Sequence, residues 1–120
     1  MPASINTRFI KYWLPVPIYA ILIFYISSVP GDNIPSVFPY QDIVFHIIEY
    51  AGFALFLSRA LKEYYPKKTR LARFLWVFLA AILYAASDEF HQSFIYMREA
   101  SAMDLGYDSI GIFLANAFYR

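Results

Sequence analysis

Four apolar stretches dominate this chain of 120 residues, and each is long enough to cross a bilayer as a helix. About 20 helical residues span the roughly 30 Å of hydrocarbon in a membrane. The composition agrees, because 60% of the residues are hydrophobic, whereas a soluble domain of this size has too small a core to bury so many apolar side chains. We therefore predict an all-α fold, a four-transmembrane-helix bundle that forms one domain over residues 1–120, with spans at about 12–28, 40–61, 71–94 and 102–119.

The composition also excludes several kinds of function. The formal net charge is +1, which argues neither for nucleic acid, which we do not expect as a partner, nor for a strongly acidic partner. The chain has no cysteine, so disulfides and thiolate chemistry are excluded. Any metal ion would need histidine and carboxylate ligands.

The first apolar stretch has an alternative interpretation as a signal peptide. Arg8 and Lys11 precede an apolar run that ends in small residues, as such a peptide requires. The following Val29-Pro30 step is a poor exit from a cleavage site, so we prefer a membrane span.

The basic residues predict the orientation of the bundle. Nine of the ten lie before the first span, around the loop between the second and third spans, or at the chain end: Arg8, Lys11, Arg59, Lys62, Lys67, Lys68, Arg70, Arg73 and Arg120. By the positive-inside rule we expect a multi-pass protein of the cell membrane with both termini in the cytoplasm. Eight of the nine carboxylates, all but Glu63, then lie at the outer end, where Arg98 is the single counter-charge.

Helical spacing gathers these outer acids around one pocket. At about 100° per residue, Asp42, His46 and Glu49 share a face of the second span, and Asp104 and Asp108 stack on the fourth. Intramembrane ionisable residues are costly and usually functional. The pocket residues that we predict are Asp42, His46, Glu49, Tyr50, Ser87, Asp88, Glu89, His91, Gln92, Arg98, Asp104 and Asp108.

Several of these acids also have a purely structural interpretation. Asp42 and Asp104 stand at the outer ends of their spans, where a helix N-terminus favours a carboxylate. Glu49 and Asp108 lie deeper, and their structural alternative is a hydrogen-bonded polar joint between helices.

The same residues carry a resemblance to a known family. Asp42-x3-His46-x2-Glu49-Tyr50, the run Ser87-Asp88-Glu89-Phe90-His91-Gln92 and Asp104-x3-Asp108-x2-Gly111 occur in order over nearly the whole chain. This pattern resembles the VanZ-like family of small integral membrane proteins. The chain departs from it at Ile43, where members often have Lys, and at Tyr96-Met97, where they often have Pro-Gly.

The resemblance implies a role at the cell envelope. The family's namesake is associated with resistance to teicoplanin, a lipid-tailed glycopeptide that binds cell-wall precursors. Our leading hypothesis is a pocket that binds or remodels an envelope lipid, a lipid-linked wall precursor or an amphiphilic drug. Membrane lipids are the general partner that we expect.

Three other functions are alternatives at this stage. A metal-assisted hydrolase or transferase acting on a lipid-linked substrate could use a divalent cation held by His46, Glu49, Asp88 and His91, although no recognised metalloenzyme spacing is present. Proton-coupled transport lacks ionisable groups in the inner half, where Asn116 is the main polar residue. A partner-binding role without a ligand would tolerate every charge-removing substitution.

Overall fold

The computed structural model describes residues 5–98 and 100–119, and these form helices joined by short loops. The elements are α1 (Ile5–Trp13), α2 (Pro15–Ser27), the 3-10 turn η1 (Gly31–Asn33), α3 (Gln41–Tyr64), α4 (Arg70–Gln92) and α5 (Ala102–Phe118). The described part of the chain contains no strand. The all-α prediction is confirmed.

The first helical unit begins earlier than predicted. Only Leu14 separates the end of α1 from the start of α2. Its backbone angles are those of a helix, so the chain continues in nearly the same direction. Pro15 and Pro17 lack amide protons and cause this break. We expected the span to begin at about Tyr12, but the long apolar helical segment begins at Thr7. Arg8 lies on α1 and binds Glu63 of α3, with Nε 3.0 Å from Oε1.

Three helical segments of the described chain are long and apolar enough to cross a membrane: Thr7–Ser27, Gln41–Tyr64 and Arg70–Gln92. The second and third agree closely with the predicted spans. α5 has 17 residues, so it extends about 25 Å at 1.5 Å per residue. The structure thus supports three spans by length and composition, and a fourth span at α5 remains a prediction.

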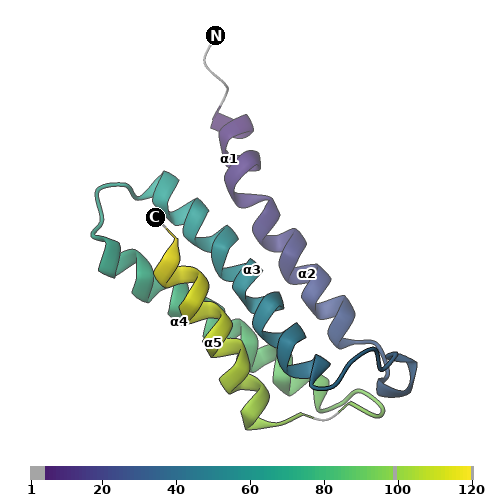
Figure 1. Cartoon of the computed structure of the whole chain (residues 1–120). Coiled ribbons are helices and arrows are strands. Elements are labelled where there is room, and N and C mark those ends of the chain that lie inside the picture. Colours follow the sequence, from purple (N-terminus) through teal and green to yellow (C-terminus); the bar gives the residue numbers. More distant parts are fainter. Residues whose placement is uncertain (1–4, 99, 120) are drawn as a thin grey trace.

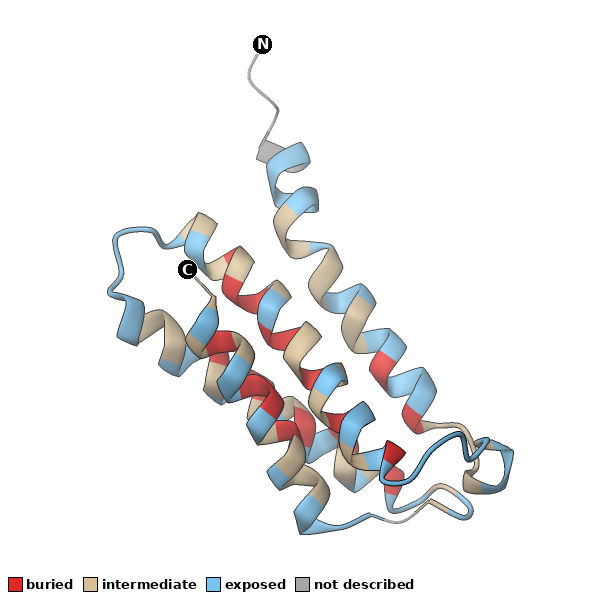
Figure 2. Ribbon diagram, in the orientation of Figure 1, coloured by how far each residue is buried: buried red, intermediate tan, exposed pale blue. Residues whose placement is uncertain are grey.

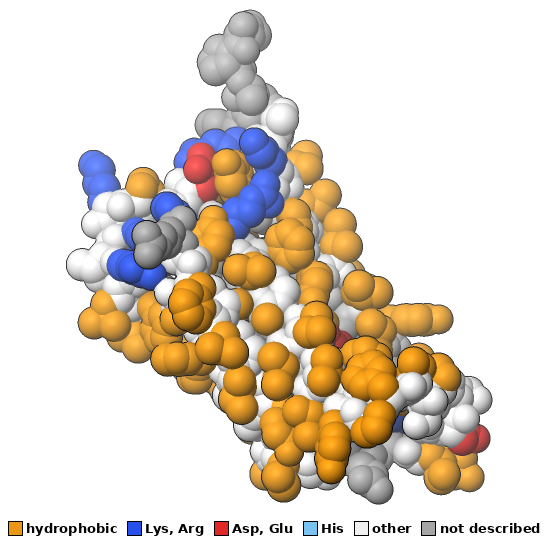
Figure 3. All heavy atoms as spheres, in the orientation of Figure 1, with side chains coloured by type: hydrophobic (Ala, Val, Ile, Leu, Met, Phe, Trp, Pro, Cys, Tyr) orange, Lys and Arg blue, Asp and Glu red, His pale blue; other side chains and the backbone are white. Residues whose placement is uncertain are grey.

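α3 is the centre of the bundle and packs against α5, α4 and α2 (Figure 1). Buried residues concentrate on the facing sides of α3, α4 and α5, while α2 buries little (Figure 2). The apolar core comprises Ile23, Tyr50, Phe53, Ala54, Leu57, Val77, Ala81, Ala85 and Ile112. Large apolar side chains also cover the outside of the middle of the bundle (Figure 3), as expected of helices that face lipid.

The two ends of the bundle differ in charge. Lys and Arg side chains gather at the end that holds the α3–α4 loop (Figure 3). The start of α1 and the end of α5 lie at this same end (Figure 1). Of the predicted basic and acidic residues, Arg120 and Glu99 lie outside the described part.

α3 and α5 approach each other closely at a glycine. A Cβ atom added to Gly111 would collide with the backbone carbonyl oxygen of Ile47. Small residues at such crossings let helix backbones pack together in a membrane. Gly106, one and a half turns earlier on α5, has open space around the same position.

This pair of glycines provides a matched test of the α3–α5 packing. We expect Gly111→Ala to lower the free energy of unfolding by about 1–3 kcal/mol, because overpacking displaces the α3 backbone. Gly106→Ala should be neutral or stabilising by up to about 1 kcal/mol, since alanine is the better helix former. Thermal unfolding of both variants in detergent measures the difference, and equal effects would contradict the packing.

Candidate functional site

A cavity of about 510 Å³ lies at the end of the bundle opposite the α3–α4 loop. The α2–α3 loop, the start of α3, the end of α4 and the start of α5 surround it. We call it the Arg98 cavity; it is lined by Gly31, Ile34, Ser36, Phe38, Pro39, Tyr40, Gln41, Asp42, His46, Gln92, Met97, Arg98, Ser101 and Asp104. Five of the twelve predicted pocket residues are in this lining: Asp42, His46, Gln92, Arg98 and Asp104.

Gln41 builds one wall of the cavity and was missed by the sequence reasoning. Its buried amide donates to the Pro35 carbonyl at 2.7 Å and accepts from the Val37 amide at 2.6 Å. These bonds fold the α2–α3 loop over the start of α3. The sequence did contain a signal for it, because Gln41 has an amide side chain and directly precedes Asp42, the first acid of the helix.

The two loops at this end of the bundle are also joined to each other. The Gly31 amide donates to the Tyr96 carbonyl at 2.9 Å. A Cβ atom at Gly31 would collide with the Met97 carbonyl. A glycine is therefore needed where the two cavity walls meet.

Arg98 is held by backbone carbonyls rather than by acids. Its Nη1 donates to the carbonyl oxygens of Ile26 and Val29, each at 3.3 Å. No carboxylate of the described residues forms an ion pair with Arg98, contrary to our expectation of a counter-charge for the acid cluster. A carbonyl oxygen has two lone pairs, so the Ile26 oxygen accepts the guanidinium in addition to the Val29 amide at 3.2 Å. The other N–H groups of Arg98 have no hydrogen-bond partner among the described residues and are available to the cavity.

His46 links the cavity to a buried layer beneath it. Its Nδ1 lies 2.7 Å from Oδ1 of Asp108, which is fully buried on α5. Its Nε2 lies 4.0 Å from Oδ2 of Asp104, at the cavity wall. One imidazole thus bridges two acids that stand one turn apart on α5.

A second buried polar contact joins α3 to α4. The hydroxyl of Tyr50, which is completely buried, donates to Oδ2 of Asp88 at 2.9 Å. Glu49 precedes Tyr50 on α3 and is partly buried. It lies about 4.5 Å deeper along the helix than His46, from the rise per residue.

Four carboxylates in this layer each keep a buried oxygen that has no hydrogen-bond partner among the described residues. These oxygens are Oε1 of Glu49, Oδ1 of Asp88, Oε2 of Glu89 and Oδ2 of Asp108. Native proteins rarely bury polar atoms without partners, because the lost hydration is costly. The layer therefore offers acceptors to protons or to polar groups of a ligand.

A family model described as VanZ/LLP1 matches residues 6–120, nearly the whole chain. This protein belongs to the VanZ/LLP1 family. The resemblance found in the sequence is thereby confirmed, and with the apolar helices it indicates a membrane protein. Comparison with curated proteins and with solved structures found no match.

Seven of the twelve predicted residues of this VanZ/LLP1 protein do not line the cavity, and three of them contact other parts of the chain. Ser87 is exposed and donates to the Tyr84 carbonyl on its own helix at 2.7 Å. His91 stacks on Phe24 of α2, with ring centroids 4.1 Å apart. Glu89 accepts the Ser101 amide at 2.6 Å and so holds the chain that leads into α5. Helical spacing places such residues on a face but does not say which neighbour that face meets.

His91 and Gln92 hold the end of α4 against α2. Nε2 of His91 lies 2.9 Å from the Ser28 hydroxyl oxygen. The Gln92 amide donates to the Ser27 hydroxyl at 3.2 Å. The two serines thus meet α4 directly, and Gln92 alone of this group also lines the Arg98 cavity.

The four candidate metal ligands of this VanZ/LLP1 protein are not brought together. His46 faces α5, while His91 faces α2, so the two histidines serve different helix contacts. Within the described residues, no three His, Asp or Glu side chains are grouped so that they could hold a metal ion. The metal-assisted hydrolase or transferase hypothesis gains no support from the geometry.

Asp42 and Asp104 both lie in the first turns of their helices, as the structural interpretation of these acids expects. The N-cap of α5 is Ser101, whose hydroxyl accepts the Asp104 amide at 3.3 Å. Asp104 is itself in the first turn and points to His46. Asp42 occupies the first turn of α3, whose N-cap residue Tyr40 makes no side-chain cap.

We predict that the Tyr50 hydroxyl stabilises the buried layer. Tyr50→Phe leaves Asp88 with both oxygens unpaired in the interior, which should lower the free energy of unfolding by about 1–3 kcal/mol. Tyr107→Phe on α5 is the control, because no hydrogen bond from the Tyr107 hydroxyl to another described residue is present. Thermal unfolding in detergent compares the two, and a Tyr50 variant as stable as the control would refute the role of this contact.

Proposed function

We propose that this membrane protein binds the head group of an envelope amphiphile in the Arg98 cavity. A lipid-linked cell-wall precursor and a lipoglycopeptide of the teicoplanin type are the candidate ligands. Resistance to such a drug would follow from its capture or from a change in its wall-precursor target. The observation that carries the proposal is a cavity with both signs of charge on its walls, above a layer of buried acids.

The two signs of charge favour a head group that carries both an anionic group and hydrogen-bond donors. Arg98 stands on one side, with guanidinium N–H groups suited to a carboxylate or phosphate. Asp42 and Asp104 stand on helices α3 and α5 and can accept from amines, amides or hydroxyls. Peptide and sugar parts of wall precursors and glycopeptides contain all of these groups.

The size and the rim of the cavity fit an amphiphile. Ligand pockets commonly enclose about 300–1,000 Å³, and this cavity is of about 510 Å³. Phe38, Tyr40 and Met97 form an exposed apolar rim on the two loops. A lipid tail could leave over this rim toward the bilayer while the head group stays among the charges.

The proposal includes a topology of four spans with cytoplasmic termini. α5 packs along α3 over its length and has an apolar exposed side with Ile110, Phe113 and Leu114. A shorter helix can cross by local thinning of the bilayer or by flanking residues that reach the interface. The positive-inside rule then places the α3–α4 loop in the cytoplasm, and the Arg98 cavity opens outside.

Topology can be tested with reporter fusions. A reporter placed after Lys68 should read cytoplasmic, and one placed between residues 96 and 101 should read external. Cysteine-labelling of the same two loops in intact cells gives an independent measurement. The opposite pattern would place the Arg98 cavity on the cytoplasmic side and contradict an envelope ligand.

Ligand binding can be tested by neutralising one charge of each sign. We expect Asp42→Asn and Arg98→Gln each to weaken binding of fluorescent teicoplanin or of a lipid-linked wall precursor about tenfold, because a charged hydrogen bond is lost. Asp32→Asn is the matched control, since this exposed acid of the α2–α3 loop does not line the cavity. Binding is measured on purified protein in nanodiscs after each variant is shown to be folded by thermal unfolding. Equal affinities for all three variants and the unmodified protein would refute the site.

A further inference from the structure

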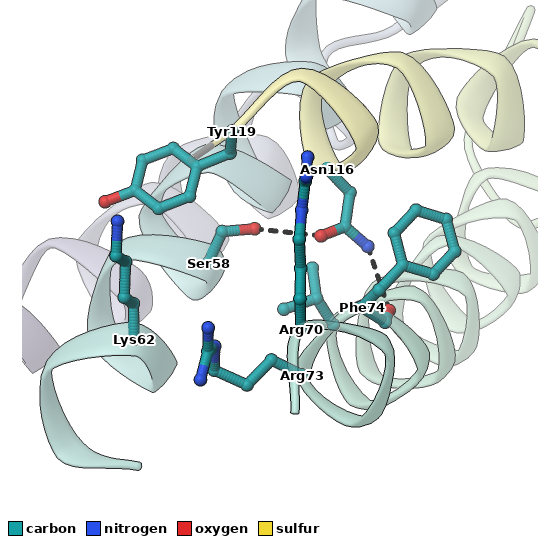
Figure 4. A pocket seen from close by; sticks show the side chains of 8 residues that line it. Ser58, Lys62, Arg70, Arg73, Phe74, Asn116 and Tyr119 are labelled. Carbon is teal, nitrogen blue, oxygen red and sulfur yellow. Dashed lines mark hydrogen bonds between the residues drawn. The ribbon is translucent and has the colours of Figure 1, made fainter. Parts of the chain in front are cut away.

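A second cavity, of about 460 Å³, lies at the opposite end of the bundle beside the α3–α4 loop. Figure 4 shows its cationic side chains, which come from α3 and α4 and point toward a common space. We call it the Arg70 cavity; it is lined by Ser58, Lys62, Arg70, Arg73, Phe74, Val77, Asn116 and Tyr119. Its described lining thus carries three positive charges and no acid.

Two guanidinium groups of the cavity are positioned by backbone carbonyls. Arg73 Nη1 donates to the carbonyls of Tyr65 at 3.2 Å and Lys68 at 2.5 Å, both in the turn after α3. Arg70 Nη2 donates to the Ala117 carbonyl at 2.8 Å, at the end of α5. Within residues 5–98 and 100–119, their other N–H groups have no hydrogen-bond partner. Donors fixed in this way lose little entropy when they bind an anion.

The third cation has no acidic partner in the described chain. Lys62 Nζ lies 5.7 Å from the centre of the Tyr119 ring, a contact that leaves its N–H groups available. Glu63 is the single acid at this end among the described residues, and it is occupied by Arg8 at 3.0 Å. The positive charge of the cavity is therefore not compensated by these residues.

Buried polar groups form the inner part of the cavity. Ser58 donates to Oδ1 of Asn116 at 3.2 Å, and the Asn116 amide donates to the Phe74 carbonyl at 2.9 Å (Figure 4). Ser58 and Asn116 are 6% and 7% exposed. They orient the amide of Asn116 next to the cations, so the cavity has a built polar wall.

We infer that the Arg70 cavity is a separate site that binds a phosphate group, carried by an anionic membrane lipid. Guanidinium and ammonium groups are the usual protein ligands of phosphate. Tyr119 connects the cavity to an apolar groove on the lipid-facing side of α3 and α5, lined by Ala51, Leu55, Leu114, Ala115 and Phe118. This groove accommodates an acyl chain while the phosphate lies among the cations. The inference does not depend on what the Arg98 cavity binds.

The test compares two lysines at the same end of the bundle. Lys62 lines the cavity, whereas Lys67 is exposed on the α3–α4 loop and does not. Lys62→Gln and Lys67→Gln remove the same charge, and neither breaks a hydrogen bond to another described residue. Native mass spectrometry of protein released from nanodiscs of phosphatidylglycerol and phosphatidylcholine counts the retained lipids. Arg70→Gln is a second, independent variant.

We expect the unmodified protein and Lys67→Gln to retain one phosphatidylglycerol and to be stabilised by it against heat in detergent. Lys62→Gln and Arg70→Gln should need at least about tenfold more lipid for the same stabilisation. Saturable stabilisation by inorganic phosphate alone, lost in the same two variants, would assign the phosphate to a soluble compound instead of a lipid. Equal retention in all variants, or equal retention of phosphatidylcholine, would overturn the site.

Discussion

The contact between His46 and Asp108 determines how the rest of this structure can be arranged. It joins α3 to α5 at 2.7 Å, and Asp108 has no exposed surface. A carboxylate in the interior of a membrane bundle is very costly unless it is paired or protonated. The adjacent α3–α5 crossing at Gly111 brings the backbones close enough for the pair to form. The small residue and the buried pair thus lie at the same crossing of α3 and α5.

The same imidazole connects stability to the cavity. His46 lines the Arg98 cavity, and its Nδ1 contacts the Asp108 carboxylate. Tyr50 and Asp88 make the corresponding joint between α3 and α4. The cavity therefore rests on side chains that also hold three helices together. A ligand that contacts His46 or Asp104 would therefore change the packing of α3 against α5.

The sequence predicted the helices well because apolar length and helical spacing are local properties. The common face of Asp42, His46 and Glu49 follows from their offsets, and α3 does carry them on one side. The position of Arg98 was harder to predict, because its partners are the backbone carbonyls of Ile26 and Val29. Every residue has a backbone carbonyl, so the sequence does not show which ones accept a side chain. His91 and Ser87 belong to the densest polar run, yet they face α2 and the outside. Spacing alone does not say which helix a face meets.

The basic end was also only partly predictable. Charge counting placed Lys62, Arg70 and Arg73 together, but it could not distinguish a topology signal from a cavity. That distinction depends on the carbonyls that hold the two guanidinium groups, and on Ser58, whose burial beside Asn116 follows from the α3–α5 contact. The two ends of the bundle thus differ in charge. One end has a cavity above buried acids and the other has a cavity lined by cations, with one apolar core between them.

The most direct test of this account is the coupling energy between His46 and Asp108. A double-mutant cycle of His46→Gln and Asp108→Asn, followed by reversible unfolding in detergent, measures it without any ligand. The account predicts strongly non-additive effects, with a coupling of about 0.5–3 kcal/mol, because each single change leaves a buried polar partner unpaired. Additive effects of the two substitutions would show that this contact does not hold α3 to α5, and the described basis of the cavity would be wrong.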